Sequence, residues 1–338
     1  MPSYFSIMKK FNSLYLFFVF VVCCFVNGIA YATSISERHM TMELNVSVLD
    51  AKQEKEIKLG VTLVVPDAPQ PWQAVVLPSN CTGQDDYFWK LMVPVLLEKG
   101  YAAILLDSFT PRGFKAVCTD KTKMWQEARV ADAVAILKVL RLDNRFDAQK
   151  IALGGHSNGA ITAFMAAYTE ANTMLKIDDL GFAAYFGVGT TCDLTFKSGK
   201  LWAPILLVSG GKDDYTFPEP CIKEIQRLKT LGGDAELLII DGANHNMSTS
   251  GWIYNPKVQR LPKGIPHMFM LGRDAKGVMQ VELEDGTLRT GRQMQEQYGG
   301  FMLNKSFGGT VGGSWDKFPV VMDAILGHLK KTGFVPLR

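Results

Sequence analysis

The stretch that decides the fold reads Ile151-Ala152-Leu153-Gly154-Gly155-His156-Ser157-Asn158-Gly159-Ala160. An apolar, β-rich run enters this stretch and a helical pattern leaves it. The spacing G-x-S-x-G places Gly155 and Gly159 where a sharp turn excludes larger residues, and the N-terminus of the helix faces the serine hydroxyl. A strand, this turn and a helix in this order predict a nucleophile elbow with Ser157 at its apex.

Alternating strand and helix patterns surround the elbow. Short β-rich runs fall at about 42–49, 57–65, 73–78, 101–107, 150–154, 182–188, 203–209 and 235–240. Helical patterns fall at about 86–99, 125–142, 158–171, 219–231 and 319–331. In the helix at 125–142, Val130 and Val134 lie on the apolar side, and Arg129 and Asp132 lie on the polar side. The alternation predicts an α/β protein with one mostly parallel, doubly wound sheet of about eight strands and helices on both faces.

A serine nucleophile needs a base, and the chain has five histidines. His245 ends the stretch Asp241-Gly242-Ala243-Asn244-His245, directly after the eighth strand run. The carboxyl ends of parallel strands meet at one edge of a sheet, and Ser157 emerges at the same edge. We therefore expect His245 to be the general base. The other four, which we expect to have packing or surface roles, are His39, His156, His267 and His328.

The carboxylate that orients this base is expected between the serine and the histidine in chain order. After the seventh strand the chain reads Ser209-Gly210-Gly211-Lys212-Asp213-Asp214-Tyr215-Thr216. Either Asp213 or Asp214 can hold the tautomer of the imidazole and stabilise its protonated form. The distance from Gly210 and from Thr216 favours Asp213, which leaves Asp214 as a capping or solvated residue.

Two backbone N–H groups are expected to form the oxyanion hole. One belongs to Asn158, directly after the serine. The other is expected in the loop after the third strand, where the N–H of Cys81 is the candidate.

Five stretches together resemble the dienelactone hydrolase family of α/β-hydrolases. They are Leu77–Gly83, Asp107–Gly113, Gly155–Gly159, Asp213–Thr216 and Asp241–His245. The resemblance covers about residues 55–248 and the last helix, and it implies the α/β-hydrolase fold. The enzymes that give the family its name use a cysteine nucleophile. This chain has Ser157 instead, which suggests a general serine esterase, and it has Ser79-Asn80 where the family carries His-Gly.

The six cysteines divide between the N-terminal segment and the remainder of the chain. Cys23 and Cys24 lie in the segment, and the other four allow three pairings. In the strand order of the family, the third and fourth strands are neighbours, and so are the sixth and seventh. The resemblance therefore implies two disulfides beside the mouth of the active site, Cys81–Cys118 and Cys192–Cys221.

The N-terminus has the pattern of a signal peptide. Lys9 and Lys10 precede an apolar run at 14–26, and Ala30-Tyr31-Ala32 offers small residues to a signal peptidase. We expect cleavage after Ala32, so that residues 1–32 are removed and 33–338 form a single domain. The expected location is periplasmic or secreted, with no stable insertion into the membrane after cleavage. The alternative is a single transmembrane anchor, for which the apolar run is short.

Composition and motifs exclude several other classes of protein. The 36 basic and 33 acidic side chains give a net charge of only +3 and are interleaved, which argues against nucleic-acid binding. The sequence lacks H-E-x-x-H, C-x-x-C and a Walker loop, and no G-x-G-x-x-G opens a first βαβ unit, so we expect no metal or cofactor.

Two features leave alternatives open. Arg112, in a Pro-Arg-Gly turn, can bind a substrate carboxylate or pair with a surface acid. An insertion at about 251–316, with an expected hairpin around Met268–Leu288, can form a lid, a substrate wall or a structural flap.

The sequence thus predicts an exported serine hydrolase that cleaves a small-molecule ester through an acyl-enzyme. A peptidase or thioesterase on the same fold is the first alternative, because the triad does not distinguish these substrates. A binding protein that retains the fold without catalysis is an alternative of another class. The oligomeric state is not indicated.

Overall fold

The computed structural model describes residues 41–43, 46–50, 55–276, 278–298 and 306–336. The predicted signal peptide at 1–32, and Cys23 and Cys24 within it, lie outside these residues. The chain divides into a unit Met1–Thr41 and a unit Met42–Arg338. The second unit contains all the described helices and strands, except that the first strand begins one residue earlier, at Thr41. No helix in the described part of the chain is long and apolar enough to span a membrane.

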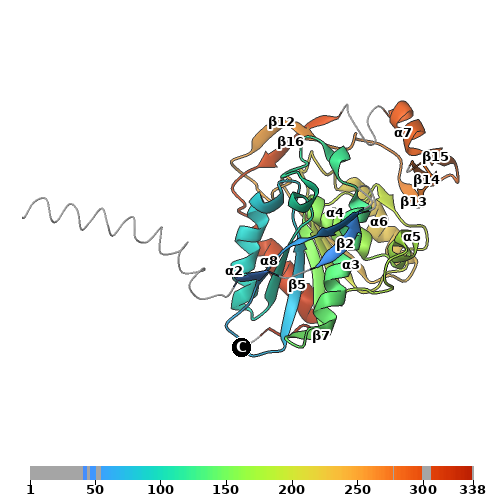
Figure 1. Ribbon diagram of the computed structural model, residues 1–338. Helices are drawn as coiled ribbons and strands as arrows, with labels where there is room; N and C mark the ends of the chain where they lie inside the picture. Colours follow the sequence, from blue (N-terminus) through green and yellow to red (C-terminus); the bar gives the residue numbers. More distant parts are fainter. Residues whose placement is uncertain (1–40, 44–45, 51–54, 277, 299–305, 337–338) are drawn as a thin grey trace, which may run out of the picture. The chain divides into compact units, whose positions relative to one another are not determined.

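An eight-stranded sheet forms the centre of the second unit (Figure 1). Its strands are β1 (Thr41–Glu43), β4 (Gly60–Val64), β5 (Trp72–Pro78), β6 (Ala102–Asp107), β7 (Phe146–His156), β8 (Ala184–Val188), β10 (Ile205–Gly210) and β11 (Ala235–Ile240). Their spatial order is β1-β4-β6-β5-β7-β8-β10-β11. Neighbours from β6 to β11 run parallel, and β4 is antiparallel to β6. This is the α/β-hydrolase arrangement that the sequence predicts.

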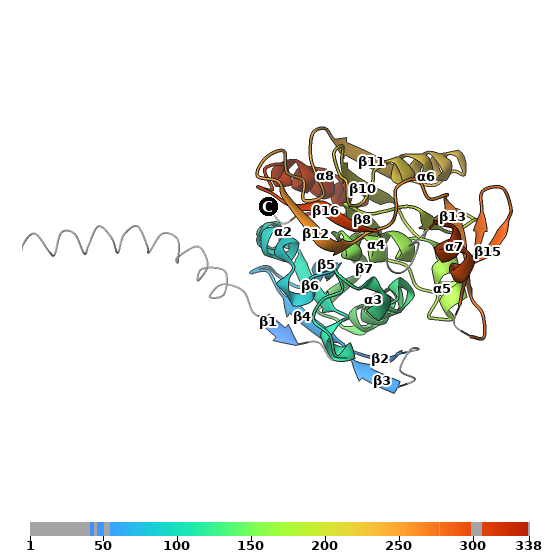
Figure 2. The same cartoon turned by 90° about the horizontal axis from the view of Figure 1, so that it is seen from above.

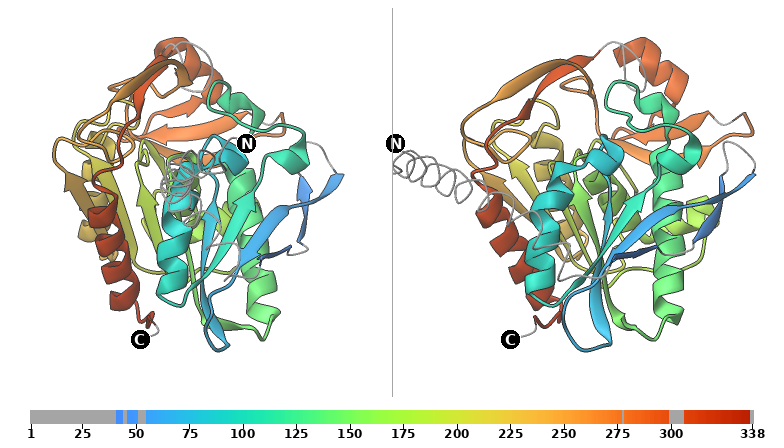
Figure 3. Two further views of the ribbon diagram at one scale, coloured as in Figure 1. Left: turned by 90° about the vertical axis from the view of Figure 1, so that its left-hand side faces the viewer. Right: turned by 60° about the vertical axis from the view of Figure 1, so that its left-hand side comes forward.

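Helices cover both faces of this sheet (Figures 2 and 3). They are α2 (Tyr87–Glu98), α3 (Gln126–Leu142), α4 (Asn158–Ala166), α5 (Thr169–Leu175), α6 (Glu219–Thr230) and α8 (Phe318–Lys331), with short 3₁₀ turns at Gly83–Asp85, Thr110–Arg112 and Lys121–Lys123. Alternate side chains of a strand point to opposite faces. In β5, Ala74 and Val76 join the buried cluster of α3–α6, whereas Val75 and Leu77 join that of α2 and α8.

Two predicted elements are divided in the structure. The runs at 42–49 and 57–65 each form two strands, because β2 (Ser47–Asp50) and β3 (Lys55–Lys58) pair with each other as a separate antiparallel sheet. The helix predicted at 158–171 stops at Ala166 and resumes at Thr169. Between them the backbone pairs with residues 200–202 in place of continuing the helical hydrogen bonds.

The insertion after β11 contributes to two small sheets. A ribbon of β12 (Ile253–Gln259) and β16 (Phe307–Gly312), called the ribbon below, lies over the carboxyl edge of the central strands (Figure 1). The second sheet has the order β15-β14-β13-β9, and its elements are β9 (Leu194–Thr195), β13 (Met268–Arg273), β14 (Met279–Leu283) and β15 (Leu288–Thr290), with α7 (Gly291–Tyr298) following. The predicted hairpin is present as the antiparallel pair β13–β14.

Candidate active site

The turn between β7 and α4 holds Ser157 in an unusual backbone conformation. Its φ is 54° and its ψ is −117°, a region that non-glycine residues rarely occupy. The glycines on either side permit this turn: a Cβ on Gly155 would lie 2.8 Å from the carbonyl carbon of Gly159, and a Cβ on Gly159 would lie 2.1 Å from the Pro78 oxygen. The predicted elbow is therefore present, and Ser157 caps the N-terminus of α4.

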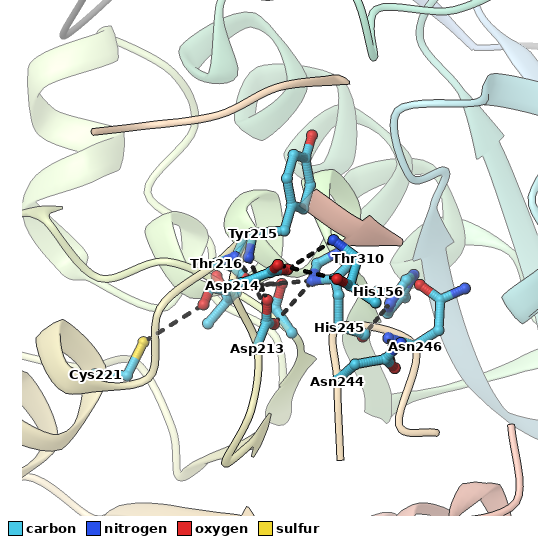
Figure 4. Close-up of polar contacts among 12 residues, drawn as sticks. His156, Asp213, Asp214, Tyr215, Thr216, Cys221, Asn244, His245, Asn246 and Thr310 are labelled. Atoms are coloured by element: carbon cyan, nitrogen blue, oxygen red, sulfur yellow. Dashed lines mark hydrogen bonds and ion pairs between the residues drawn. The ribbon is translucent and has the colours of Figure 1, made fainter. Parts of the chain in front are cut away.

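Asp213 and His245 lie side by side in the loops after β10 and β11 (Figure 4). Asp213 Oδ2 accepts a hydrogen bond from His245 Nδ1 at 2.9 Å, and Oδ1 accepts two more from the N–H groups of Tyr215 and Thr216, both at 2.8 Å. Burial acts to raise the pKa of Asp213, but the neighbouring His245 and the hydrogen bonds hold it below its ordinary value. Asp213 is therefore an ionised carboxylate beneath the imidazole.

The neighbouring carboxylate, Asp214, points elsewhere (Figure 4). It accepts hydrogen bonds from the N–H of Thr310 at 2.6 Å and from its hydroxyl at 2.9 Å. Thr310 belongs to β16, so Asp214 ties the ribbon to this loop. Of the two candidates, the structure brings Asp213 and not Asp214 to His245.

Ser157 and His245 both lie against the end of β8. The N–H of Ser157 donates to Val188 O at 2.8 Å, and a Cβ on Gly189 would lie 3.1 Å from His245 Cε1. Within the described residues no hydrogen bond joins the Ser157 hydroxyl to His245.

His156, which lies in the turn next to Ser157, contacts the backbone of His245. Its ring stacks on Phe88 with 5.4 Å between centroids, and its Nε2 lies 3.2 Å from the carbonyl oxygen of His245. A carbonyl only accepts, so Nε2 carries the proton. Burial and, next, the charge of His245 lower the pKa of His156 to about 3. His156 is thus neutral and holds the backbone of His245.

The two expected oxyanion donors are backbone N–H groups for which the described residues supply no hydrogen-bond acceptor. Asn158 is the first residue of α4, where an N–H has no partner within the helix. On either side of Cys81, the N–H of Asn80 donates to Asp86 Oδ2 at 2.7 Å and that of Thr82 donates to Asn80 Oδ1 at 2.8 Å. The N–H of Cys81 itself has no partner in the described part of the chain.

The loops that carry Ser157, Asp213 and His245 all lie within one stretch that matches a protein family. The model described as "Dienelactone hydrolase family" matches residues 59–259, more than half of the chain. This chain belongs to the dienelactone hydrolase family. The match includes Ser157, Asp213 and His245 and ends at the last residue of β12.

Comparisons with other proteins give low identities. No curated protein matches this family member by sequence. A Klebsiella pneumoniae protein whose structure is described as that of a dienelactone hydrolase has 16% sequence identity to this chain and a TM-score of 0.47. The alignment covers 61% of this chain and 88% of the Klebsiella chain. Butyrate-bound esterase Est2 of Thermogutta terrifontis has 17% identity and a TM-score of 0.42, over 60% and 84%. Dipeptidyl peptidase 4 of Porphyromonas gingivalis has 18% identity and a TM-score of 0.44, over 61% and 32%.

One residue that the sequence analysis missed in this hydrolase is Arg129. The helical pattern assigned Arg129 and Asp132 to the polar side of α3, which is wrong, because both are completely buried. Arg129 donates through Nη1 to Asn158 Oδ1 and through Nη2 to Ser79 O. A signal was available in the helical spacing, because Arg129 begins a stripe of fully buried positions. The stripe continues with Ala133, Ile136, Leu137 and Leu140.

Arg112, the candidate for binding a substrate carboxylate, is engaged with a buried acid. Its guanidinium makes a bidentate ion pair with Asp132, at 2.8 and 2.9 Å, and donates to Ser108 O at 2.8 Å. The Arg112 side chain is only 4% exposed. Its partner is therefore an acid, as one of the two interpretations held, but an acid of the core and not of the surface.

Both disulfides implied by the family resemblance are present. Cys81 is bonded to Cys118 and Cys192 to Cys221. The first bond fastens the loop after β5, where the N–H of Val117 also donates to Cys81 O at 2.8 Å. The second fastens the segment after β8 to α6.

The ribbon also touches the histidine loop through Tyr215. The Tyr215 ring meets the His245 ring edge-on, with 4.7 Å between centroids, and its hydroxyl donates to Gln259 O at 3.0 Å. A Cβ on Gly309 would lie 2.8 Å from the same ring. Both strands of the ribbon therefore pack on the residue that covers the imidazole.

Among the described residues no cluster of His, Cys, Asp or Glu can hold a metal ion. A cavity of about 690 Å³ lies beside α3 and α5, but Ser157, Asp213 and His245 do not line it.

Proposed function

We propose that this protein is a serine esterase whose triad is Ser157, His245 and Asp213. Membership in the dienelactone hydrolase family supports a hydrolase that acts on esters. The observation that carries the triad is the buried hydrogen bond from His245 Nδ1 to Asp213 Oδ2. Ser157, on its strained turn, lies against the end of the same strand, β8, as His245 does. The bond to Asp213 leaves His245 Nε2 as the nitrogen that can accept a proton.

In the proposed reaction, Ser157 Oγ attacks the carbonyl carbon of the ester, and its proton passes to His245 Nε2. The C–O bond to the alcohol then breaks, and the alkoxide leaves with that proton. Water attacks the acyl-enzyme, gives a proton to His245, and releases the carboxylic acid while Ser157 recovers its hydrogen. Asp213 stabilises the imidazolium that exists at each tetrahedral stage.

The oxyanion of each tetrahedral intermediate is proposed to bind the N–H groups of Cys81 and Asn158. Their lack of other partners among the described residues supports this role. Such donors are effective because they are already oriented before charge develops on the oxygen.

We further propose that residues 33–338 form one exported domain, with the insertion at about 251–316 as part of its active-site wall. Two disulfides support an oxidising compartment, since such bonds are rare in proteins of the cytosol. The Tyr215 and Asp214 contacts support the place of the ribbon in the wall.

The test is hydrolysis of a panel of p-nitrophenyl esters, with matching thioesters and peptide anilides, by the wild type and by Ser157→Ala and His245→Ala. We expect ester turnover and fluorophosphonate labelling by wild type alone. Turnover of a thioester faster than that of the matching ester would indicate a thioesterase, and faster turnover of a peptide anilide would indicate a peptidase. If the wild type neither hydrolyses any of these substrates nor is labelled by the fluorophosphonate, the proposal of an enzyme is overturned. The alternative of a binding protein that retains the fold would then stand.

A further inference from the structure

Arg129 is a fully buried guanidinium whose hydrogen bonds go to neutral oxygens. Its two Nη atoms donate to the side-chain oxygen of Asn158 and to the main-chain oxygen of Ser79. The neighbouring Arg112 behaves as a buried arginine usually does, because it forms a bidentate pair with the carboxylate of Asp132. Within the described residues Arg129 has no hydrogen bond to a carboxylate.

Nearby carboxylates offset part of the cost of burying the Arg129 charge. Burial lowers the pKa of Arg129 to about 10, and the nearby carboxylates of Asp132, Asp86 and Asp107 act against this shift. Arg129 therefore stays positive at neutral pH. Removing a charge from water is costly, so the hydrogen bonds of Arg129 and the nearby carboxylates must offset this cost.

The two oxygens that Arg129 holds lie on the two segments of the proposed oxyanion hole. Asn158 carries one donor N–H on its own backbone, and Ser79 lies two residues before Cys81, which carries the other. The segments also touch directly, because a Cβ on Gly159 would lie 2.1 Å from Pro78 O. Arg129 thus spans α4 and the loop after β5 from within the core.

Asp86 holds the same loop from another direction. Its Oδ2 accepts from the N–H of Asn80 at 2.7 Å, and its Oδ1 accepts from the Asn80 side chain at 2.8 Å. Arg129 binds Ser79 O, and Asp86 binds Asn80. The two residues that precede Cys81 are therefore both held in place. The N–H of Cys81 is the group that this arrangement leaves available.

We propose that Arg129 is a positioning residue for the oxyanion hole, which sets the spacing between the N–H groups of Cys81 and Asn158. The proposal rests on the proposed function, because it assigns a task to these two donors. Loss of one oxyanion donor lowers kcat by about 10²–10³-fold, and a displacement of about 1 Å can cost 10²-fold. Substitution of Arg129 should therefore slow acylation while substrate binding is preserved.

The experiment compares Arg129→Gln and Arg129→Lys with Arg141→Gln in the purified full chain. Arg141 is a matched control, because it lies on the same helix and donates through Nη2 to the Gly181 carbonyl oxygen at 2.6 Å. The measurements are kcat and KM for a p-nitrophenyl ester and the inhibition constant of an aryl trifluoromethyl ketone. The hemiketal that this ketone forms with Ser157 carries the oxyanion.

For Arg129→Gln we expect kcat/KM to fall by about 10²-fold and the inhibition constant to rise by a similar factor, with KM within about threefold of wild type. Arg129→Lys should fall between wild type and Arg129→Gln, because it keeps the charge but not the two-pronged contact. Arg141→Gln should keep the wild-type kcat and inhibition constant. This pattern separates positioning from general destabilisation.

Wild-type values of kcat and of the inhibition constant in a folded Arg129→Gln would overturn the inference and leave the esterase standing. Should Arg129→Gln fail to fold, Asn158→Ala carries the test, since it removes the acceptor of Nη1 and retains the backbone N–H. An unchanged kcat in Asn158→Ala would overturn the inference equally. A wild type without turnover or labelling would overturn the proposed function and this inference with it.

Discussion

Asp213 and Asp214 are neighbours in the chain, yet their carboxylates serve different partners: Asp213 accepts from His245 at 2.9 Å, and Asp214 accepts from Thr310 in the ribbon. Successive side chains of this loop point in different directions. One acid therefore binds the imidazole, while the next fastens the ribbon, which packs on Tyr215, the residue that covers the imidazole. The pair offers a sharp test, because two like substitutions at adjacent positions should have different results.

We expect Asp213→Asn to lower kcat by about 10⁴-fold, because an amide no longer holds the imidazole in the reactive tautomer. Asp214→Asn should change kcat by less than about tenfold, because its hydrogen bonds go to Thr310. Steady-state kinetics with one p-nitrophenyl ester measures both. Equal losses in the two variants would contradict the assignment of Asp213.

The glycine next to the elbow is expected to be irreplaceable. In Gly159→Ala the new Cβ would lie 2.1 Å from Pro78 O, so the elbow must shift and fluorophosphonate labelling should disappear. The control is Gly327→Ala in α8, where a Cβ meets nothing within 4 Å and should stabilise the helix by up to about 1 kcal/mol. Labelling and thermal unfolding measure the two effects. Normal labelling of Gly159→Ala would contradict the described turn.

The buried His156 should make stability sensitive to acid. Its pKa is about 3 in the folded chain and near 6.5 when unfolded, so between these values only the unfolded chain takes up the proton. Stability from this residue is therefore complete above about pH 6.5 and is lost as the pH falls towards about 3. His156→Gln should lose less stability than wild type between pH 7 and pH 4.5.

Thermal unfolding at the two pH values measures this difference. Burial raises the pKa of Asp86 to about 7, so the contribution of Asp86 to the free energy of unfolding falls as the pH rises over the same window. Comparing wild type with His156→Gln separates this effect from that of His156. Both chains retain Asp86, and its effect cancels. An identical pH dependence in wild type and His156→Gln would contradict the assigned burial of a neutral imidazole.

The two disulfides should differ in their effect on catalysis. Replacing either pair by serine removes a loop constraint and should cost about 2–4 kcal/mol of unfolding free energy. The Cys81→Ser/Cys118→Ser variant should also lose kcat, because Cys81 lies in the loop of the proposed oxyanion hole. Cys192→Ser/Cys221→Ser should retain kcat at temperatures where it is folded. Denaturant unfolding and ester kinetics test this, and equal kcat in the two variants would contradict it.

The elbow and the order of strands and helices could be predicted from sequence because their causes are local. Gly155 and Gly159 restrict one turn, and the alternation of apolar positions reports each strand or helix from its own residues. Where the prediction was wrong, the cause was distant. The helix expected at 158–171 is divided because its backbone at Tyr168 pairs with Leu201.

The sequence by itself determined the fold class, the sharp turn at Ser157 and, through the resemblance to the family, the pairing of the cysteines. Only the tertiary structure decided which aspartate meets His245, since the choice depends on Thr310, 96 residues beyond Asp214. Tertiary structure also decided which oxygens Arg129 binds, because its acceptors, Ser79 and Asn158, come from two other segments. Side-chain direction depends on partners that arrive by folding, and a local pattern does not contain them.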